Sequence, residues 1–483
     1  MQIRTIALAV LCSSALLAHA ATGVGPFENS QWEKPAGYIG RTFTMSHAYP
    51  TAASAPAMPW REAINNGPIT TANAPAYTEA LKAAIGDDMR VLLQDYEHWD
   101  ADARGWYNEP WMGKTSVVAK MAGMREPLRG LYSGSPGMSG ALFKASGLKK
   151  DFNTYVLVYY DKTAAVTLNN IWGESALTPT LNPQSTQFAE GSVIVKAAFI
   201  TAGPNDWPVM RGTLAWPGYI SDPLVPKGTP PDPKLTQTYL MQFDIIVKDS
   251  VAAPKTGWVF STLVYDARVP SPDNDIWKKM VVLGAQWGND SQANNPAVPF
   301  PVLMENWSNP IAPAYGNATL GWGQRLSGPN DGAMNDVGMS KTVASTPVKY
   351  VKNAKDSSCM SCHSSSQWDT DNPKIGSPSF LLPSYTPGFA APPSCVKTLK
   401  DPHPACKGFL GSPTAGSLAW MKWFKNRQGY QPMDPRPGVV AGDFDMVLTF
   451  KSLPSWFTET QNLGEHPLLG ADKSGRSLQL RLH

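Results

Sequence analysis

The residues best suited to chemistry in this chain are two cysteines and a histidine that lie close together, Cys359, Cys362 and His363. Three positions separate the thiols, which places both on one turn, and the imidazole follows directly. Two thiols in this arrangement can add to the two vinyl groups of a haem, and the adjacent imidazole can bind its iron. The spacing therefore predicts one covalent haem c, with thioethers at both cysteines and His363 as the proximal iron ligand.

Three other interpretations of these residues stay open. A redox dithiol normally opens a helix after a strand of a βαβ unit, and no parallel α/β pattern surrounds Cys359. A zinc site would also draw on Cys395, His403 or Cys406, whose spacings fit no common zinc finger. A disulfide between Cys359 and Cys362 would close a tight, strained loop. We therefore expect haem attachment, and a single haem, because no other histidine follows a C-x-x-C.

The motif resembles that of c-type cytochromes, and within this group the small class I proteins carry a Met ligand on a loop well after the haem motif. Met433 lies 70 residues after His363 and is our candidate distal ligand. The segment after it argues against a class I fold. Residues 444–450 alternate between apolar and polar side chains, which predicts a strand where a closing helix should be.

A second resemblance is to cytochrome P460 and the cytochromes c′-β, which are β-sheet proteins with a late haem motif. Residues 191–196, 257–260 and 442–450 resemble three of their strands in the same order, although about 80 residues separate His363 from the last one. This resemblance implies an open or weakly blocked distal face, and either hydroxylamine oxidation or the binding of small gases. Lys196 matches a strand Lys of that family, and we expect it to be a solvated strand-end residue.

The first twenty residues have the three parts of a secretory signal peptide. Arg4 gives a positive start, residues 6–18 are apolar, and Ala18 and Ala20 form a small-x-small end before Ala21. The apolar run is too short to cross a bilayer with margin, and no other run of the necessary length exists, so we expect no membrane span after cleavage. These features predict a periplasmic or secreted protein.

Export also bears on the remaining cysteines. Cys12 lies inside the signal peptide, which leaves Cys395 and Cys406 besides the motif. In an oxidising compartment such a pair is most simply a disulfide, which would close a loop that contains His403. We expect His403 to lie on the surface of that loop.

The composition narrows the fold and the partners. Lys and Arg number 41 against 38 Asp and Glu, with no basic run, so we expect no nucleic-acid partner. Charged residues are only 16% and aromatic residues 10%, which argues against disorder. The 44 Pro and 40 Gly favour strands, turns and loops over long helical bundles. We therefore expect a β-rich α+β fold with antiparallel sheets, a few short helices, long Pro/Gly-rich loops and a haem-bearing C-terminal part.

Hydrophobic periodicity predicts the main elements. Strands are expected over residues 154–160, 191–199, 239–248 and 257–266, with the last two as neighbours. Helices are expected after Asn73, with Tyr77, Leu81, Ala84 and Ile85 on one face, and from Ser417.

The chain divides into a signal peptide (1–20), a β-rich region (21–340) and a haem-bearing region (341–483), with one continuous domain over 21–483 as the alternative. Arg325, shortly before the haem motif, is a candidate partner for a haem propionate, although an ordinary surface position is the simpler expectation.

Three functions fit these expectations. The first is an exported monohaem cytochrome in periplasmic electron transfer, with a redox partner protein and a Met or His opposite His363. The second is a haem redox enzyme or gas-binding protein with an open distal site. The third is a binding module in which the haem is structural. We expect the first, and whether the protein is also an enzyme stays open.

Overall fold

The computed structural model describes most of the chain between residues 34 and 462. The described residues are 27, 34–53, 55–112, 125–134, 138–148, 150–222, 232–293, 302–332, 342–343, 346–347, 358–371, 373, 424–433 and 435–462. The predicted signal peptide, the helix expected from Ser417, His403 and the predicted Cys395–Cys406 disulfide lie outside these residues and stay predictions.

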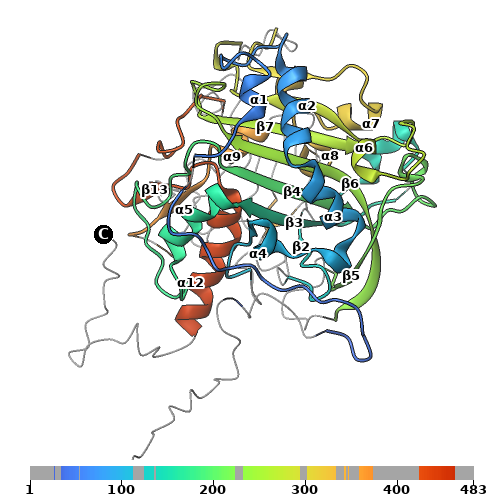
Figure 1. Cartoon of the computed structure of the whole chain (residues 1–483), viewed down its shortest axis with the longest axis horizontal. Helices are drawn as coiled ribbons and strands as arrows, with labels where there is room; N and C mark the ends of the chain where they lie inside the picture. Colours follow the sequence, from blue (N-terminus) through green and yellow to red (C-terminus); the bar gives the residue numbers. More distant parts are fainter. Residues whose placement is uncertain are drawn as a thin grey trace, which may run out of the picture.

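A large antiparallel sheet forms the centre of the described structure (Figure 1). Its main path runs in the order β1 (Trp106–Tyr107), β3 (Thr154–Asp161), β4 (Val193–Ile200), β6 (Lys234–Lys248), β7 (Trp258–Tyr265), β8 (Met280–Gln286) and β9 (Asn306–Ser308). Two further strands join it, β2 (Tyr132–Ser133) beside β3 and β5 (Ala215–Ile220) beside β6. The predicted β-rich α+β class with antiparallel sheets and short helices is confirmed.

The strands expected from periodicity are confirmed as β3, β4, β6 and β7. β6 and β7 pair as neighbours, as predicted, and the register places Asp244 opposite Thr262. β7 is buried along its whole length, which explains why its sequence is a nearly continuous apolar run with little alternation. The connection between β6 and β7 ends at Gly257, whose φ of 80° suits a residue without a Cβ.

The two faces of the sheet carry separate hydrophobic cores. In β3, Tyr155, Leu157 and Tyr159 belong to the first core, whereas Val156, Val158 and Tyr160 belong to the second. This division follows from the alternation of side chains along a strand. The site described below lies on the second face.

Short helices cover both cores (Figure 1). α2 (Ala74–Ala84) and α3 (Gly86–Gln94) contribute to the first core, and α5 (Lys162–Trp172) and α12 (Leu453–Asn462) to the second. The remaining helices of the described residues are α1 (Pro59–Glu62), α4 (Ala101–Arg104), α6 (Ile276–Lys279), α7 (Ala314–Asn317), α8 (Pro329–Gly332) and α9 (Cys359–His363). Of the helices that the structure describes, none has the length and apolar character needed to cross a membrane.

The expected helix after Asn73 is confirmed as α2, with one correction to its buried face. Tyr77 and Leu81 are fully buried and Ile85 is nearly so. Ala84, which we expected on the same face, is exposed. It lies at the last position of α2, where the chain turns into α3, so helical spacing no longer sets its burial.

The strand expected over residues 444–450 is wrong. Residues 448–452 form a π-helical turn that continues into α12. The Asp445 carboxylate accepts hydrogen bonds from the amides of Val447 and Leu448 and so starts the helix. The wider turn lies just before Pro454, which lacks the N–H of a regular helix. The short alternation of apolar and polar residues therefore predicted a strand wrongly, because the cap at Asp445 favours a helix there.

Two small sheets complete the described fold. β12 (Gln367–Asp369) pairs with β13 (Val439–Ala441), and β10 (Thr342–Val343) pairs with β11 (Thr346–Pro347). The second core combines residues of both predicted regions, for example Val158 and Trp258 with Met360, Phe444 and Trp456.

Candidate functional site

The C-x-x-C-H residues form the single-turn helix α9. Ser358 precedes it, and its hydroxyl accepts a hydrogen bond from the Ser361 amide at 3.2 Å. The Ser361 hydroxyl accepts one from the Ser358 amide at 2.7 Å, which completes a capping box. These contacts satisfy amides at the start of a helix that is too short to be stable by itself.

The three residues of the motif that could do chemistry lie on the accessible side of α9. Cys359, Cys362 and His363 are partly exposed, whereas Met360 and Ser361 are buried. This division follows from the i, i+3, i+4 spacing on a helix. No disulfide joins Cys359 and Cys362 in the structure.

A buried glutamine at the end of β8 fixes α9 to the sheet. The Gln286 side chain accepts a hydrogen bond from the Met360 amide at 3.0 Å and donates one to the Ser358 hydroxyl at 3.2 Å. The Cys359 amide donates to the carbonyl of Leu326 at 3.0 Å. The side chain of Met360 lies in the second core. Polar and apolar contacts together therefore determine which side of α9 faces outward.

The imidazole of His363 is oriented by a backbone carbonyl. Its Nδ1 lies 2.8 Å from the carbonyl oxygen of Phe444. A carbonyl can only accept, so Nδ1 carries the proton in this contact and the lone pair of the neutral ring is on Nε2. The Phe260 ring packs beside the imidazole with a centroid separation of 4.6 Å. This is the tautomer in which Nε2 can bind a metal.

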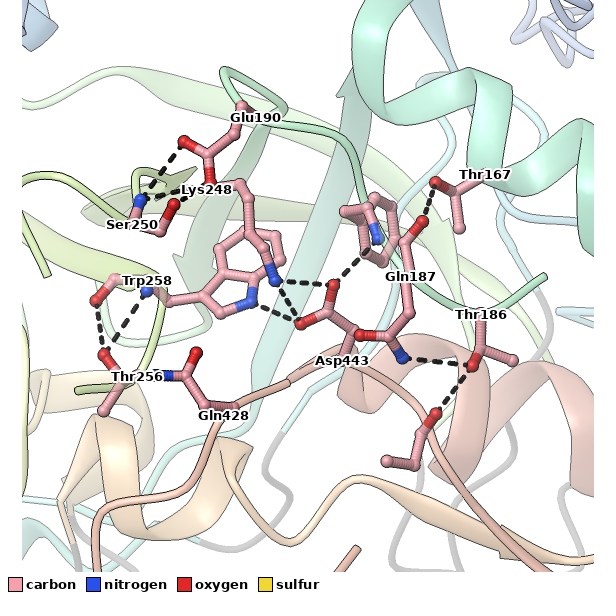
Figure 2. A network of polar contacts seen from close by, with 12 residues as sticks. Thr167, Thr186, Gln187, Glu190, Lys248, Ser250, Thr256, Trp258, Gln428 and Asp443 are labelled. Atoms are coloured by element: carbon pink, nitrogen blue, oxygen red, sulfur yellow. Dashed lines mark hydrogen bonds and ion pairs between the residues drawn. The ribbon is translucent and has the colours of Figure 1, made fainter. Parts of the chain in front are cut away.

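The Phe444 carbonyl belongs to a turn held by the buried carboxylate of Asp443 (Figure 2). Lys248 Nζ donates to it at 2.7 and 2.9 Å, and Trp258 Nε1 donates at 2.7 Å. The Phe188 amide donates at 2.8 Å. The contacts come from β6, from β7 and from the segment before β4, so the turn is tied to two strands of the sheet and to one segment beside it.

A second carboxylate lies on the other side of this turn. Asp445 accepts a hydrogen bond from the hydroxyl of Tyr160 at 2.8 Å, and burial raises the pKa of its carboxyl to about 6. Burial and the nearby charge of Asp445 raise the pKa of Glu109 well above its usual value. Trp172 Nε1 donates to Glu109 at 2.7 Å. Two neighbouring acidic groups with raised pKa values therefore lie close to the turn that contacts His363.

Two expectations about basic residues are corrected. Arg325 is not on the surface: it is fully buried, and its guanidinium donates to the carbonyls of Asn289 and Asp290 at 2.8 and 3.1 Å. Burial lowers its pKa to about 10. Lys196 is not a solvated strand-end residue, because it lies inside β4 and its Nζ is 2.9 Å from a carboxylate oxygen of Asp244. In both cases partners far along the chain decide the burial.

Sequence reasoning missed the buried Arg427 beside the motif. Its guanidinium donates to the Ser364 hydroxyl at 3.5 Å and to the Lys425 carbonyl at 3.2 Å. Burial lowers its pKa to about 10. The contact with Ser364 comes entirely from the tertiary fold, since 63 residues separate the two.

Met433 is buried at the end of the described segment 424–433. The same segment packs against Asp443 at Gly429, where a Cβ would collide with the carboxylate. Gly429 therefore lies against the turn whose Phe444 carbonyl contacts His363 Nδ1. The distal-ligand role of Met433 stays a prediction.

The zinc alternative also stays open in part. Within the described ranges, no group of three or more His, Cys, Asp or Glu side chains could hold a metal ion. The further ligands that it would need, Cys395, His403 and Cys406, lie outside those ranges.

Comparisons with protein-family models, with curated proteins and with solved structures found no match to this chain.

Proposed function

We propose that the protein is an exported monohaem c-type cytochrome that transfers electrons in the periplasm. One observation carries the proposal: two thiols and an imidazole with its Nδ1 proton on a backbone carbonyl share the accessible side of one helical turn. A thiol pair alone would suit several functions. The fixed tautomer of the neighbouring imidazole favours a metal ligand.

The residues around α9 suit a haem. Cys359 and Cys362 would hold it through thioethers, and His363 through Nε2. Arg427 is a candidate partner for a propionate, because it is a largely buried cation in contact with Ser364, next to His363. Bound in this way, a haem supplies one-electron chemistry between ferric and ferrous iron.

The chain's own side chains would orient and shield this centre. The Phe444 carbonyl holds the imidazole in one orientation, and Phe260 covers one side of the ring. Gln286 and Met360 keep α9 against the sheet. A rigid ligand set lowers the reorganisation that accompanies a change of one charge, which suits electron exchange with a redox partner protein.

The direct test replaces the motif cysteines. In a host that attaches haem, Cys359→Ser or Cys362→Ser should lose or destabilise the attached haem, measured by haem staining after denaturing electrophoresis. The double variant Cys395→Ser/Cys406→Ser is the matched control, because it removes two cysteines outside the motif, leaves no unpaired thiol and should leave the haem attached. Full retention of haem in both motif variants would overturn the proposal.

The second candidate is a haem redox enzyme or small-gas-binding protein with an open distal site, resembling cytochrome P460. The contact of Gly429 with Asp443 favours it, because four residues before Met433 the chain is held against the turn whose Phe444 carbonyl accepts the hydrogen bond from His363 Nδ1. Visible spectra with and without carbon monoxide separate the two. A reduced spectrum unmoved by carbon monoxide and altered by Met433→Ala supports the electron carrier, whereas a shift with carbon monoxide supports the open site.

A further inference from the structure

The carbonyl that orients His363 lies in a strained turn. Asp443 has a φ of 43° and Phe444 a φ of 68°, both in the left-handed region. Asp adopts this region more readily than most residues, but a bulky aromatic residue such as Phe does so rarely. The turn therefore needs ties to the rest of the fold in order to keep the Phe444 carbonyl directed at the imidazole.

Asp443 supplies these ties from inside the protein. Its side chain is fully buried, and the Lys248 side chain that pairs with it is 13% exposed. Figure 2 shows the Lys248 ammonium and the Trp258 indole both directed at this carboxylate. A buried carboxylate is strongly disfavoured without such partners, so the turn cannot swing away without breaking an ion pair and leaving a buried charge.

Neighbouring contacts join the same turn to the haem motif. The Gly442 amide donates to the carbonyl of Ser366 at 3.0 Å, and the Ser366 hydroxyl donates to the carbonyl of Asp445 at 2.5 Å. Ser366 lies three residues after His363. The turn is thus held to the end of the motif on both sides and to the sheet through Asp443.

We propose that Asp443, together with Lys248, is a positioning residue that holds the Nδ1 hydrogen bond of His363 through the Phe444 carbonyl. Neither side chain contacts the imidazole in this scheme; their effect passes through the backbone of the turn. A firm hydrogen bond at Nδ1 makes the imidazole a stronger electron donor at Nε2, which stabilises the higher charge of ferric iron. This redox consequence rests on the proposed function, whereas the positioning of the ring does not.

The test follows the Nδ1 proton of His363 in the full chain labelled with ¹⁵N-histidine. Asp443→Asn keeps the size of the side chain and a residue that tolerates positive φ, but removes the charge. Hydrogen exchange at Nδ1 should be at least about tenfold faster in this variant. In haem-loaded protein the midpoint potential should rise, because a weaker hydrogen bond makes His363 a poorer donor.

A matched control is available in the connection between β6 and β7. Asp249 is also fully buried, and its partner Arg61 has a side chain that is 16% exposed, close to the 13% of Lys248. Asp249→Asn should destabilise the protein to a similar degree and leave the exchange rate and the potential unchanged. Lys248→Gln removes the same ion pair as Asp443→Asn from its other end, and serves if the Asp443 variant fails to fold.

The outcomes separate this inference from the proposed function. Faster Nδ1 exchange in Asp443→Asn or Lys248→Gln, but not in Asp249→Asn, supports the positioning role, even if the chain carries no haem. Attached haem in the parent protein, with exchange rates in these variants equal to that of the Asp249→Asn control, overturns the positioning role and leaves the proposed function standing.

Discussion

The central sheet of this molecule is stabilised by other interactions than the motif region, which comprises residues 358–369 and the turn at residues 442–445 packed against them. In β3, β4, β6 and β7 most side chains are apolar and fully covered. In the motif region the covered side chains are largely polar: Ser358, Ser361, Ser364, Ser365, Ser366, Gln367, Asp369, Asp443 and Asp445. The sheet therefore depends on burial, and the motif region on hydrogen bonds.

This difference teaches what each region can tolerate. Apolar burial is not directional, so a sheet core can lose contacts and keep its topology. A buried hydrogen bond fixes an angle as well as a distance, and losing one partner leaves the other unsatisfied. The motif region thus has a defined geometry around His363, and it tolerates fewer substitutions than the sheet. The experiments below test whether the two regions are as separate as this comparison implies.

The largest effect on stability is expected in the sheet. Phe243 is fully buried in β6 and meets Trp277 edge to face at 4.9 Å between ring centroids. Phe243→Ala should lower the free energy of unfolding by about 3–5 kcal/mol through lost transfer energy and a cavity. Chemical denaturation measures this loss. The His363 Nδ1 signal of the folded variant should not change, and a changed signal would show that the two regions are coupled.

A pH-dependent effect should arise from the motif region. The pKa of Asp445 is about 6 in the folded chain, against 3.8 for an ordinary Asp. Between these values the folded chain holds a proton that the unfolded chain releases, so stability is highest below the window and falls as pH rises through it. Each pKa unit between the folded and the unfolded value corresponds to about 1.4 kcal/mol in the free energy of unfolding.

Asp445→Asn should flatten this dependence while it keeps an acceptor for the amides of Val447 and Leu448. Denaturation midpoints measured on both sides of the window test this. An unchanged slope in the variant would assign the titration to another group, first of all to Glu109, whose pKa is also raised.

A smaller effect should come from a single hydroxyl of the motif region. Ser366→Ala removes the donor to the Asp445 carbonyl and the contact with the Thr449 hydroxyl at 3.1 Å. We expect a loss of about 1–3 kcal/mol in the free energy of unfolding, because buried groups lose their partner. Ser192→Ala is the control near β4: its buried hydroxyl has no hydrogen-bond partner among the described residues, so its removal should be nearly neutral. Equal losses in the two variants would remove the distinction between the regions.

The smallest effect is expected at the surface. Lys278 and Asp273 form an exposed ion pair, with side chains 49% and 57% accessible. Lys278→Ala should leave the denaturation midpoint unchanged, because solvent and salt screen such a pair. A clear shift of the midpoint would mean that surface charge contributes to the stability of the sheet.

The sequence by itself determined the elements whose causes are local. The strands β3, β4, β6 and β7 follow from runs of β-branched and aromatic residues, and α2 follows from apolar residues at helical spacing. The shared accessible face of Cys359, Cys362 and His363 also follows from spacing within one turn. The prediction failed at residues 444–450, where a seven-residue alternation was weaker than the cap at Asp445.

Only the tertiary structure decided how the motif is supported. His363 meets a carbonyl 81 positions away, and Asp443 meets Lys248 across 195 positions. Arg325 is buried because carbonyls of a distant loop accept its hydrogen bonds. Such contacts leave no periodic trace in the sequence, because each joins two segments that are far apart along the chain and meet only in the folded structure. The motif therefore predicts the chemistry that we propose, and the fold determines the geometry around His363.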